Sequence, residues 1–347
     1  MLISPEDHYI SQLETQCKYV RWNRLDPDNK QFWGDWLALR QLRTILNDLK
    51  PDVVFTFTIK PNIFTGLSLK HLNTKFVPTV TGLGSSFTEK SRLSWIHKWL
   101  YKRALSSANE VFFHNSSDHE LFKDLGLIDK QASRVIPGSG MNASKVDFKP
   151  NPRGKEFVFL FASRILEEKG ILEFLEAAEN VKCQMDRVKF EVVGAISKRT
   201  RKSTRDILSK AAKNNIVTYH GGVDDALPVM EKCDCIVLPS YREGLSRTLL
   251  ETMAMGRPII ASDVPGCSEL VTENGLLTPP KNSAELSKAM ITMTLKNHEE
   301  LYQMASVGRQ IVIKKYSVDK VVNFYLSLIQ DESPEPYLLQ VADPIKG

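Results

Sequence analysis

The sequence lacks several features that would place it in a special class of proteins. Its 347 residues include no run of 18 apolar residues, so no segment is expected to span a membrane. The first residues, MLISPEDHY, have neither the basic segment nor the apolar core of a secretory signal. The five cysteines form no CxxC pair, and the seven histidines show no HExxH or other close ligand spacing. These absences favour a cytoplasmic protein without a bound metal.

Charge is present in ordinary amount but is unevenly distributed. The chain has a net charge of +5, with 25% charged and 42% hydrophobic residues, as in ordinary globular proteins. Residues 1–147 carry 19 Lys/Arg against 15 Asp/Glu, whereas residues 148–347 carry 27 against 26. A mildly basic first part suits phosphates or an anionic membrane surface. The basic run 197–205 has no interleaved aromatic residues and no nucleic-acid-binding motif, so a solvated face or loop is favoured and no nucleic acid is expected.

Apolar runs alternate with amphipathic helical segments along the chain. Short β-branched runs such as DVVFTFT (52–58) and FVFLFASR (157–164) are typical of buried parallel strands. Two successive series of such units predict an α/β protein with two doubly wound parallel-sheet domains. The turn-rich segment 137–154 separates the two series. The expected division is a first domain at 1–147, a second at 148–320, and a helix end and tail at 321–347 that could return to the first domain.

The first domain is expected to lack its first strand–helix unit. Met1–Ile3 already resembles the end of a strand, and Ser4-Pro5-Glu6 resembles its exit. A doubly wound domain ordinarily has an earlier strand, glycine-rich turn and helix, about 25–30 residues in all.

Two glutamates stand eight residues apart in SYREGLSRTLLETMAMGRPIIASDVPG (240–266). Ser246 is a good helix N-cap and follows the strand DCIVLPS, so the helix is expected to begin at the carboxyl end of that strand. The free backbone N–H groups of its first turn would form an anion site suited to a diphosphate. Glu243 precedes the cap, and Glu251 lies about 7.5 Å further along the helix axis. Because a carboxylate would repel a diphosphate, each of the two glutamates is better suited to bind hydroxyl groups, one on each side of the diphosphate. A nucleotide sugar fits this arrangement better than a metal does, the alternative being an incidental pair on a surface helix.

Two cations lie on another loop of the same domain. Arg164 ends the strand FLFAS and Lys169 directly precedes a helix. Together they could hold a diphosphate leaving group, each charged hydrogen bond contributing about 1.5–3 kcal/mol. A surface arginine and lysine are the plain alternative.

These segments resemble a known family. FASRILEEKG, VTYHGGV and PSYREGLSRTLLETMAMGRPIIASDVPGCSELV are similar to the donor domain of the retaining family-4 glycosyltransferases, whose fold is GT-B: two Rossmann-like domains facing a cleft. TFTIKPNIF, TVTGLGSSF and RVIPGSGMN resemble bacterial members that build capsule, O-antigen or other lipid-linked glycans. The resemblance covers nearly the whole chain.

The resemblance implies a role for each matching residue. Glu243 would bind the donor sugar, Glu251 the ribose, and Arg164 and Lys169 the departing diphosphate, with no metal or other cofactor. The remaining assignments are the backbone N–H groups of Gly244, Leu245 and Ser246 for the donor, and, on the acceptor side, Lys60, Thr81 and Gly82. Thr81 stands where many relatives have a histidine, so no catalytic histidine is assigned. The acceptor hydroxyl would attack from the leaving-group face, and configuration would be retained.

The implied activity is transfer of a hexose or N-acetylhexosamine from a nucleotide diphosphate sugar, most readily a UDP-sugar, to a lipid-linked surface polysaccharide intermediate. The alternatives are a non-catalytic sugar-nucleotide-binding remnant and, more weakly, a GT-B epimerase or phosphorylase. The expected location is cytoplasmic and peripheral on the inner face of the plasma membrane. Residues 90–105, KSRLSWIHKWLYKRAL, would contact the membrane, since they combine tryptophans with five basic residues. A helix packed on the sheet with a basic outer side is the alternative.

Four weaker signals favour ordinary structural roles. GLGSSF (82–87) starts like a dinucleotide fingerprint, but Phe87 replaces the third glycine, which argues against NAD. Asp26-Pro27-Asp28 matches the D-x-D pattern of metal-dependent transferases yet lies in a polar loop typical of a turn. His114 is expected to be a satisfied histidine at a strand end rather than a group facing the cleft. Cys233 and Cys235 alternate onto one face of a strand as packed thiols.

Overall fold

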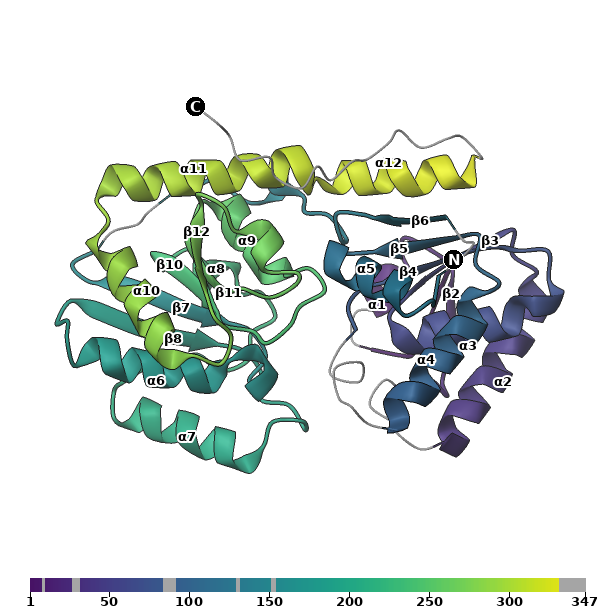
Figure 1. Cartoon of the computed structure of the whole chain (residues 1–347), viewed down its shortest axis with the longest axis horizontal. Helices are drawn as coiled ribbons and strands as arrows, with labels where there is room; N and C mark the ends of the chain where they lie inside the picture. The colour runs from purple at the N-terminus through teal and green to yellow at the C-terminus, as the bar shows by residue number, and fades with distance from the viewer. Residues whose placement is uncertain (8–9, 27–31, 84–91, 129–131, 151–153, 331–347) are drawn as a thin grey trace. The chain divides into compact units, whose positions relative to one another are not determined.

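The computed structural model describes residues 1–330 except 8–9, 27–31, 84–91, 129–131 and 151–153. The chain consists of two compact units, Met1–Val135 and Ile136–Gly347 (Figure 1). No helix among the described residues is both long and apolar enough to cross a membrane.

Unit 1 (Met1–Val135) is built on a four-stranded parallel sheet with the order β3-β4-β5-β6. Its strands are β3 (Val53–Phe57), β4 (Lys75–Val80), β5 (Glu110–Phe113) and β6 (Ala132–Val135). Its longer helices are α2 (Phe32–Leu49), α3 (Ile59–Ser68), α4 (Arg92–Leu105) and α5 (Ser116–Asp124), with a 3-10 turn η1 (Leu69–His71) after α3. The strictly sequential strand order is that of a chain of right-handed strand–helix–strand units.

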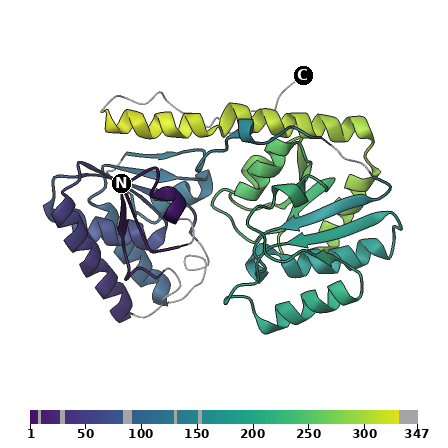
Figure 2. The same ribbon diagram turned by 180° about the vertical axis from the view of Figure 1, so that it is seen from behind.

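The first strand of unit 1 does not join this sheet. β1 (Leu2–Ser4) pairs in parallel with β2 (Tyr19–Arg21) in a separate two-stranded sheet, and the short helix α1 (Ile10–Leu13) lies between them in sequence (Figure 2, dark purple). The strand expected at Met1–Ile3 is therefore present, but the four-stranded sheet starts at β3.

Six of the ten residues of helix α3 are buried, and the other four are partly exposed. The helix packs against both α2 and α4. A β-carbon at Gly66 would lie 2.4 Å from the carbonyl oxygen of Ala104, so the glycine is required for the close approach of α3 and α4. The indole of Trp22 donates to the Ala38 carbonyl oxygen of α2 (2.9 Å) and fixes the segment after β2 on this core.

Unit 2 (Ile136–Gly347) contains a six-stranded parallel sheet with the order β12-β11-β10-β7-β8-β9. The strands are β7 (Phe157–Ala162), β8 (Val188–Val193), β9 (Thr218–Tyr219), β10 (Cys235–Leu238), β11 (Ile259–Ser262) and β12 (Gly275–Thr278). The chain runs outward from β7 to β9, returns to the other side of β7 at β10, and continues to β12. This reversal between β7 and β10 is a topological switch point, the place where doubly wound sheets bind ligands.

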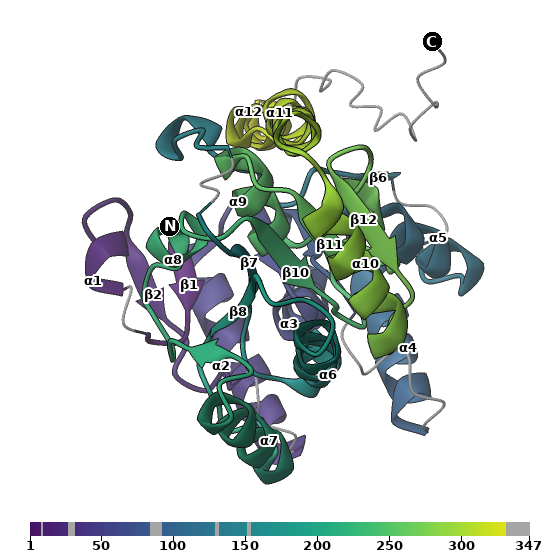
Figure 3. The same cartoon turned by 90° about the vertical axis from the view of Figure 1, so that its left-hand side faces the viewer.

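Helices cover both faces of the sheet of unit 2 (Figures 1 and 3). Alternate residues of β7 enter two different cores: Phe159 and Phe161 pack with α6, and Leu160 and Ala162 pack with α9. Burial on both faces explains why the strand is a continuous apolar run. The helices are α6 (Ile171–Lys182), α7 (Lys202–Lys213), α8 (Leu227–Met230), α9 (Arg247–Met255), α10 (Ser283–Leu295), α11 (His298–Lys315) and α12 (Val318–Ile329), with 3-10 turns η3 (Ala143–Lys145), η4 (Glu167–Lys169) and η5 (Ser268–Leu270).

The segment expected to be a linker belongs structurally to unit 2. Met141 donates its backbone N–H to the Tyr316 carbonyl oxygen (2.7 Å) and accepts from the Val318 N–H (3.2 Å). Val146 is buried in the core beside α9. The division between the compact units therefore lies after Val135, earlier than the boundary expected after residue 147, because these residues already pack on the second sheet.

Candidate active site

The site lies at the carboxyl ends of β7 and β10, at the switch point of unit 2. The loop after β7 turns through Gly170, whose φ of +75° only glycine adopts readily. A β-carbon there would lie 2.1 Å from the Pro239 carbonyl oxygen at the end of β10. This close contact brings the residues after β7 against those after β10, although they are far apart in sequence.

Lys169 and Glu243, both predicted from the sequence, are in direct contact. Nζ of Lys169 donates to Oε1 of Glu243 at 2.5 Å, and Oγ of Ser240 donates to the same oxygen at 2.8 Å. The two side chains are only 15% and 13% exposed, so water screens their interaction weakly. The backbone N–H of Glu243 donates to the Pro265 carbonyl oxygen (3.2 Å), which fixes the loop from behind. The cation expected to hold a diphosphate is thus held by the carboxylate expected to hold a sugar.

The helix after this loop begins as the sequence predicts. Oγ of Ser246 accepts from the backbone N–H of Leu249 (3.3 Å), so Ser246 is the N-cap of α9. One expectation is corrected here: the backbone N–H of Ser246 donates to the Gly266 carbonyl oxygen (3.0 Å) and is not available to a donor substrate. The cause is the loop after β11, whose Gly266 lies against the Glu243–Gly244 peptide and has no room for a β-carbon. Gly244 and Leu245 lie on the partly exposed rim of this loop.

Glu251 faces outward from α9, one turn beyond the cap region. Its Oε1 accepts from Nε of Arg247 at 2.8 Å, and Arg247 is largely exposed. The sequence did not single out Arg247, although its i,i+4 spacing to Glu251 is a known signal for a helical ion pair. An exposed arginine pair of this kind contributes little stability, so the Glu251 carboxylate can exchange this partner for a ligand hydroxyl at small cost.

Arg164 lies at the end of β7 with an exposed side chain. Its carbonyl oxygen accepts from the Leu166 N–H (2.9 Å), whereas its side chain forms no hydrogen bond or ion pair within the described part of the chain. It shares the β7–α6 connection with Lys169, but only Lys169 contacts Glu243. Arg164 is thus the exposed cation of the pair.

A second polar cluster beside the site was not predicted. The hydroxyl of Tyr241 donates to Oε1 of Glu173 at 2.7 Å, and its backbone N–H donates to the Glu168 carbonyl oxygen (2.9 Å). Nζ of Lys281 lies 4.7 Å from the centre of the Tyr241 ring, a cation–π contact. Burial first, and then the bond to Glu173, raise the pKa of Tyr241. The four-residue spacing between Lys169 and Glu173 is the sequence signal that could have placed Glu173 beside the site.

The basic run 197–205 supports the same loop from the other side. Arg199 pairs with Glu168 (3.0 Å) and Arg201 with Glu167 (2.7 Å), so both acidic residues of η4 are tied to this run. Oγ1 of Thr200 also donates to the Ile165 carbonyl oxygen (2.7 Å). The run therefore consists of the loop before α7 and the first turn of α7, and its contacts hold η4 in place.

In unit 1, the acceptor-side residues lie at the carboxyl edge of the four-stranded sheet. Lys60 is in the first turn of α3, where its Nζ pairs with Asp35 of α2 (2.8 Å) and donates to the Asp26 carbonyl oxygen (2.9 Å). Thr81 and Gly82 directly follow β4 and are partly exposed. Pro27 and Asp28 of the D-x-D pattern, and residues 84–87 of GLGSSF, lie outside the described residues.

The first turn of α3 is held to the end of β4 by a buried amide. Nδ2 of Asn62 donates to the Thr79 carbonyl oxygen (2.8 Å), and its Oδ1 accepts from Thr56 (2.7 Å). Thr58, at the start of α3, has a φ of +71°, which is strained for a β-branched residue. No sequence pattern indicates this strained residue, which lies two positions before Lys60.

Comparison with known proteins agrees with this geometry. Residues 156–295 match the family model for glycosyl transferases group 1, and residues 1–115 match the model described as glycosyl transferase 4-like. The chain belongs to the family-4 glycosyltransferases. The matches cover the switch-point site of unit 2 and the acceptor-side residues of unit 1.

Relatives of this glycosyltransferase include two bacterial enzymes that the chain matches over more than four-fifths of its length. It is 28% identical over 306 residues to the N,N'-diacetylbacillosaminyl-diphospho-undecaprenol alpha-1,3-N-acetylgalactosaminyltransferase of Campylobacter jejuni, covering 83% of this chain and 79% of that protein. It is 24% identical to the UDP-Gal:alpha-D-GlcNAc-diphosphoundecaprenol alpha-1,3-galactosyltransferase of Escherichia coli, covering 85% and 80%.

Solved structures show the same fold. Sucrose-phosphate synthase from Thermosynechococcus elongatus superposes with a TM-score of 0.76 at 21% identity, over 91% of this chain and 84% of that one. Anabaena HepE in complex with UDP-glucose gives 0.75 at 18% identity, over 94% and 90%. The predicted GT-B fold with two Rossmann-like domains is confirmed.

Burial governs three ionisable residues of weaker signal, His114, Cys233 and Cys235. Desolvation lowers the pKa of His114 to about 4, so the imidazole is neutral at physiological pH. Cys233 and Cys235 are fully buried, and burial raises the pKa of the Cys233 thiol to about 12. Among the described residues, no group of three His, Cys, Asp or Glu side chains is arranged to bind a metal.

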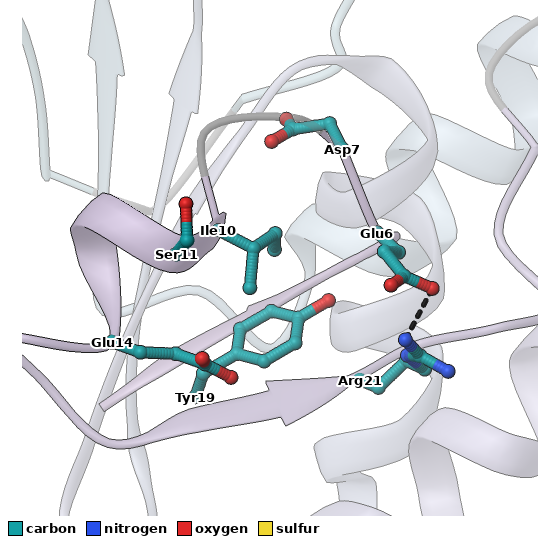
Figure 4. Close-up of a pocket in the computed structure, with 7 residues that line it drawn as sticks. All are labelled: Glu6, Asp7, Ile10, Ser11, Glu14, Tyr19 and Arg21. Carbon is teal, nitrogen blue, oxygen red and sulfur yellow. Dashed lines mark ion pairs between the residues drawn. The ribbon is translucent and has the colours of Figure 1, made fainter.

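A hollow of about 550 Å³ lies elsewhere, on the β1–α1–β2 part of unit 1 (Figure 4). An ion pair between Glu6 and Arg21 closes one side of it, and Tyr19 lies across its floor. None of the predicted site residues lines this hollow, and its wall has more acidic than basic side chains. Its lining therefore does not suit a diphosphate.

Proposed function

We propose that this chain is a retaining glycosyltransferase that moves a hexose or N-acetylhexosamine from a UDP-sugar to a lipid-linked diphosphate glycan. The product would be an intermediate of a surface polysaccharide such as capsule or O-antigen. The observation that carries the proposal is the Lys169–Glu243 contact at the switch point, which combines a cation for a diphosphate with a carboxylate for a sugar hydroxyl.

The names of the relatives support the substrate class. The two bacterial transferases described above both act, by name, on sugars linked through a diphosphate to undecaprenol. One of them is named for a UDP-sugar donor, and HepE was solved with UDP-glucose. A lipid-linked acceptor also fits a peripheral location on the inner face of the plasma membrane.

The chemistry follows from the charges of the site. The acceptor hydroxyl oxygen forms a bond to the anomeric carbon while the bond from that carbon to the diphosphate breaks. The hydroxyl proton passes to a diphosphate oxygen, so no protein nucleophile is required and attack on the leaving-group face retains configuration. Lys169 and Arg164 compensate the charge that develops on the diphosphate, which removes the need for a divalent metal. Loss of one such donor typically costs about 100–1000-fold in rate.

Hydroxyl recognition is assigned to the two glutamates and to the acceptor-side residues. Glu243 would accept hydrogen bonds from the donor sugar and Glu251 from the ribose, with Gly244 and Leu245 beside them. Lys60, Thr81 and Gly82 would contact the acceptor.

The first experiment is thermal unfolding with UDP, GDP and ADP, each with and without EDTA, on the wild type and on Arg164→Ala. A nucleotide at 100 times its dissociation constant adds about 2.7 kcal/mol to the free energy of unfolding. We expect stabilisation by UDP that EDTA does not change and that Arg164→Ala weakens. The matched control is Arg187→Ala, because Arg187 is an exposed arginine at the opposite, amino end of β8.

Turnover then tests the reaction itself. UDP-sugars are offered with a short-chain polyprenyl diphosphate sugar, and NMR of the product reports the configuration of the new anomeric carbon. Transfer with retained configuration supports the proposal. Stabilisation by UDP without transfer to any such acceptor would indicate a non-catalytic nucleotide-sugar-binding protein, and inverted configuration would refute the mechanism.

A further inference from the structure

Four of the five tryptophans of the chain are exposed, and all four lie on two helices of unit 1. Trp33 and Trp36 of α2 are 75% and 46% exposed, and Trp95 and Trp99 of α4 are 71% and 56% exposed. The fifth, Trp22, is 2% exposed in the core. Large exposed apolar groups mark interaction surfaces, and these four lie on the two helices that pack against α3.

On each helix the exposed apolar residues lie opposite the buried face. The buried faces consist of Ala38, Leu42 and Leu46 on α2 and of Tyr101, Ala104 and Leu105 on α4. At 100° per residue, the exposed apolar side chains fall on the other side of each helix. They form what we call the tryptophan surface: Trp33, Trp36 and Leu37 on α2, and Trp95, Ile96 and Trp99 on α4.

Both halves of the tryptophan surface are at the carboxyl edge of the sheet of unit 1. Helix α4 follows β4 in the chain and α2 runs back toward the start of β3, so both helices have their first turns at this edge (Figure 1). The ion pair between Asp35 and Lys60 (2.8 Å) ties the first turn of α2 to the first turn of α3. The tryptophans therefore share an edge with Lys60 and Thr81 of the acceptor side.

The charged residues around the α4 tryptophans are all Lys or Arg, whereas α2 carries two Arg and two Asp. Helix α4, Arg92–Leu105, contains four Lys/Arg and no Asp/Glu. Lys102 and Arg103 are exposed beside Trp99. On α2, the guanidinium of Arg40 lies 5.7 Å from the centre of the Trp36 ring. Tryptophan with adjacent cations is the composition that anchors proteins at the headgroup level of anionic membranes.

We propose that the tryptophan surface docks unit 1 on an anionic lipid bilayer, with α2 and α4 both contributing. The sequence pointed only to residues 90–105, of which 90–91 lie outside the described residues; α2 supplies a second, independent half of the surface. Docking at this edge directs the acceptor side toward the bilayer, where a lipid-linked acceptor is held. That last step rests on the proposed function, whereas the docking itself does not.

The test is binding to vesicles of phosphatidylcholine with and without phosphatidylglycerol, in the absence of donor and acceptor. We expect binding only to the anionic vesicles, with a blue shift of tryptophan fluorescence and quenching by brominated acyl chains. Trp33→Ser/Trp36→Ser and Trp95→Ser/Trp99→Ser should each lower the vesicle affinity about tenfold or more. The control pair, Leu295→Ser/Ile313→Ser, removes equally exposed apolar residues from unit 2 and should leave the affinity unchanged.

The charge contribution has its own matched variants. Each cation near an anionic surface contributes about fivefold in affinity, so replacing Lys98, Lys102 and Arg103 with glutamine should weaken binding about 100-fold. The control set makes the same change in net charge on α7 of unit 2: Lys202→Gln, Lys210→Gln and Lys213→Gln. Equal losses in the two sets would overturn the assignment to the tryptophan surface.

Other outcomes separate the two proposals. Absence of binding to anionic vesicles, or an unchanged affinity of the α2 variant, overturns the docking surface. A dimer in the absence of lipid that the tryptophan variants dissociate would show that a second copy of the chain is the occupant, and would also overturn it. Vesicle binding by a protein that transfers no sugar would uphold the docking and reject the proposed function. Where both hold, the tryptophan variants lose transfer to an acceptor in vesicles but keep stabilisation by UDP.

Discussion

Replacing Glu243 with glutamine tests whether this carboxylate holds Lys169 until a diphosphate takes its place. Lys169 Nζ lies 2.5 Å from Glu243 Oε1, and both side chains are about seven-eighths buried. A nucleotide that binds Lys169 must therefore compete with Glu243. Removing the carboxylate charge should leave UDP affinity intact or raise it, by up to about tenfold, while transfer is lost because the donor sugar is no longer held.

The magnitude follows from the burial of the pair. Breaking a fully buried ion pair costs about 3–5 kcal/mol and an exposed pair about 0–1 kcal/mol. With 15% and 13% exposure, we expect Lys169→Met to lower the free energy of unfolding by about 2–3 kcal/mol. Glu243→Gln should cost somewhat less, since an amide oxygen can still accept from Lys169 and Ser240.

The assays are urea unfolding and UDP titration of both single variants and the double variant. The double-mutant cycle should give a coupling free energy of about 1–3 kcal/mol between the two residues. Lys169→Met should weaken UDP binding while Glu243→Gln does not. A coupling below about 0.3 kcal/mol, or a parallel loss of UDP affinity in both single variants, would refute the reasoning.

Three further predictions concern other parts of the molecule. Gly170→Ala should lower the free energy of unfolding of unit 2 by about 2–4 kcal/mol in urea, because its β-carbon would lie 2.1 Å from a backbone oxygen. The control, Gly221→Ala, has a similar φ of +77° with no atom within 4 Å, and should lower it by only about 1 kcal/mol. Equal effects of the two variants would contradict the close contact at Gly170. His114 has a pKa of about 4 in the folded protein against about 6.5 unfolded, so its neutral form contributes stability above pH 6.5 that is lost as the pH falls toward 4. His114→Gln should remove up to about 3 kcal/mol of this acid sensitivity, measured by urea unfolding at pH 7.5 and 4.5, and an unchanged pH dependence would reject the assignment. Tyr241→Phe should lower the free energy of unfolding by about 1–2 kcal/mol, because Glu173 loses its hydroxyl donor. Glu173→Gln should lower it less, because the amide oxygen can still accept from Tyr241. A larger loss of stability in Glu173→Gln than in Tyr241→Phe would argue against this bond.

The sequence predicted those features that depend on neighbours along the chain. The strand–turn–helix at 235–255, with Ser246 as N-cap, is confirmed, and Gly256 ends the helix with a φ of +83°. Alternating apolar runs also predicted the doubly wound sheets, since both faces of each strand must be covered. These patterns are local, and the residues that form them are read directly from the sequence.

Contacts between distant segments could not be predicted in the same way. The pairing of Lys169 with Glu243, 74 positions apart, depends on how closely two loops approach at the switch point. This approach depends on the short distance between Gly170 and the Pro239 carbonyl oxygen, which cannot be predicted from a sequence pattern. For the same reason the N–H of Ser246 was assigned to a donor although a glycine carbonyl after β11 accepts it. Helical periodicity predicts which face of α2 is buried, but it does not say what the outer face with Trp33 and Trp36 meets.

The pairing of Met141 with Tyr316 and Val318 has a consequence for how the protein is made. All internal contacts of unit 1 are formed by residues 1–135, so that unit can fold while the rest of the chain is still being synthesised. The opening residues of unit 2 must instead wait for partners near residue 318. At about 5–20 residues per second, the ribosome needs roughly 10–40 s to reach them. During this interval the nascent chain presents an unfinished second unit, and a premature stop before residue 316 should leave that unit open to proteases while the first unit survives.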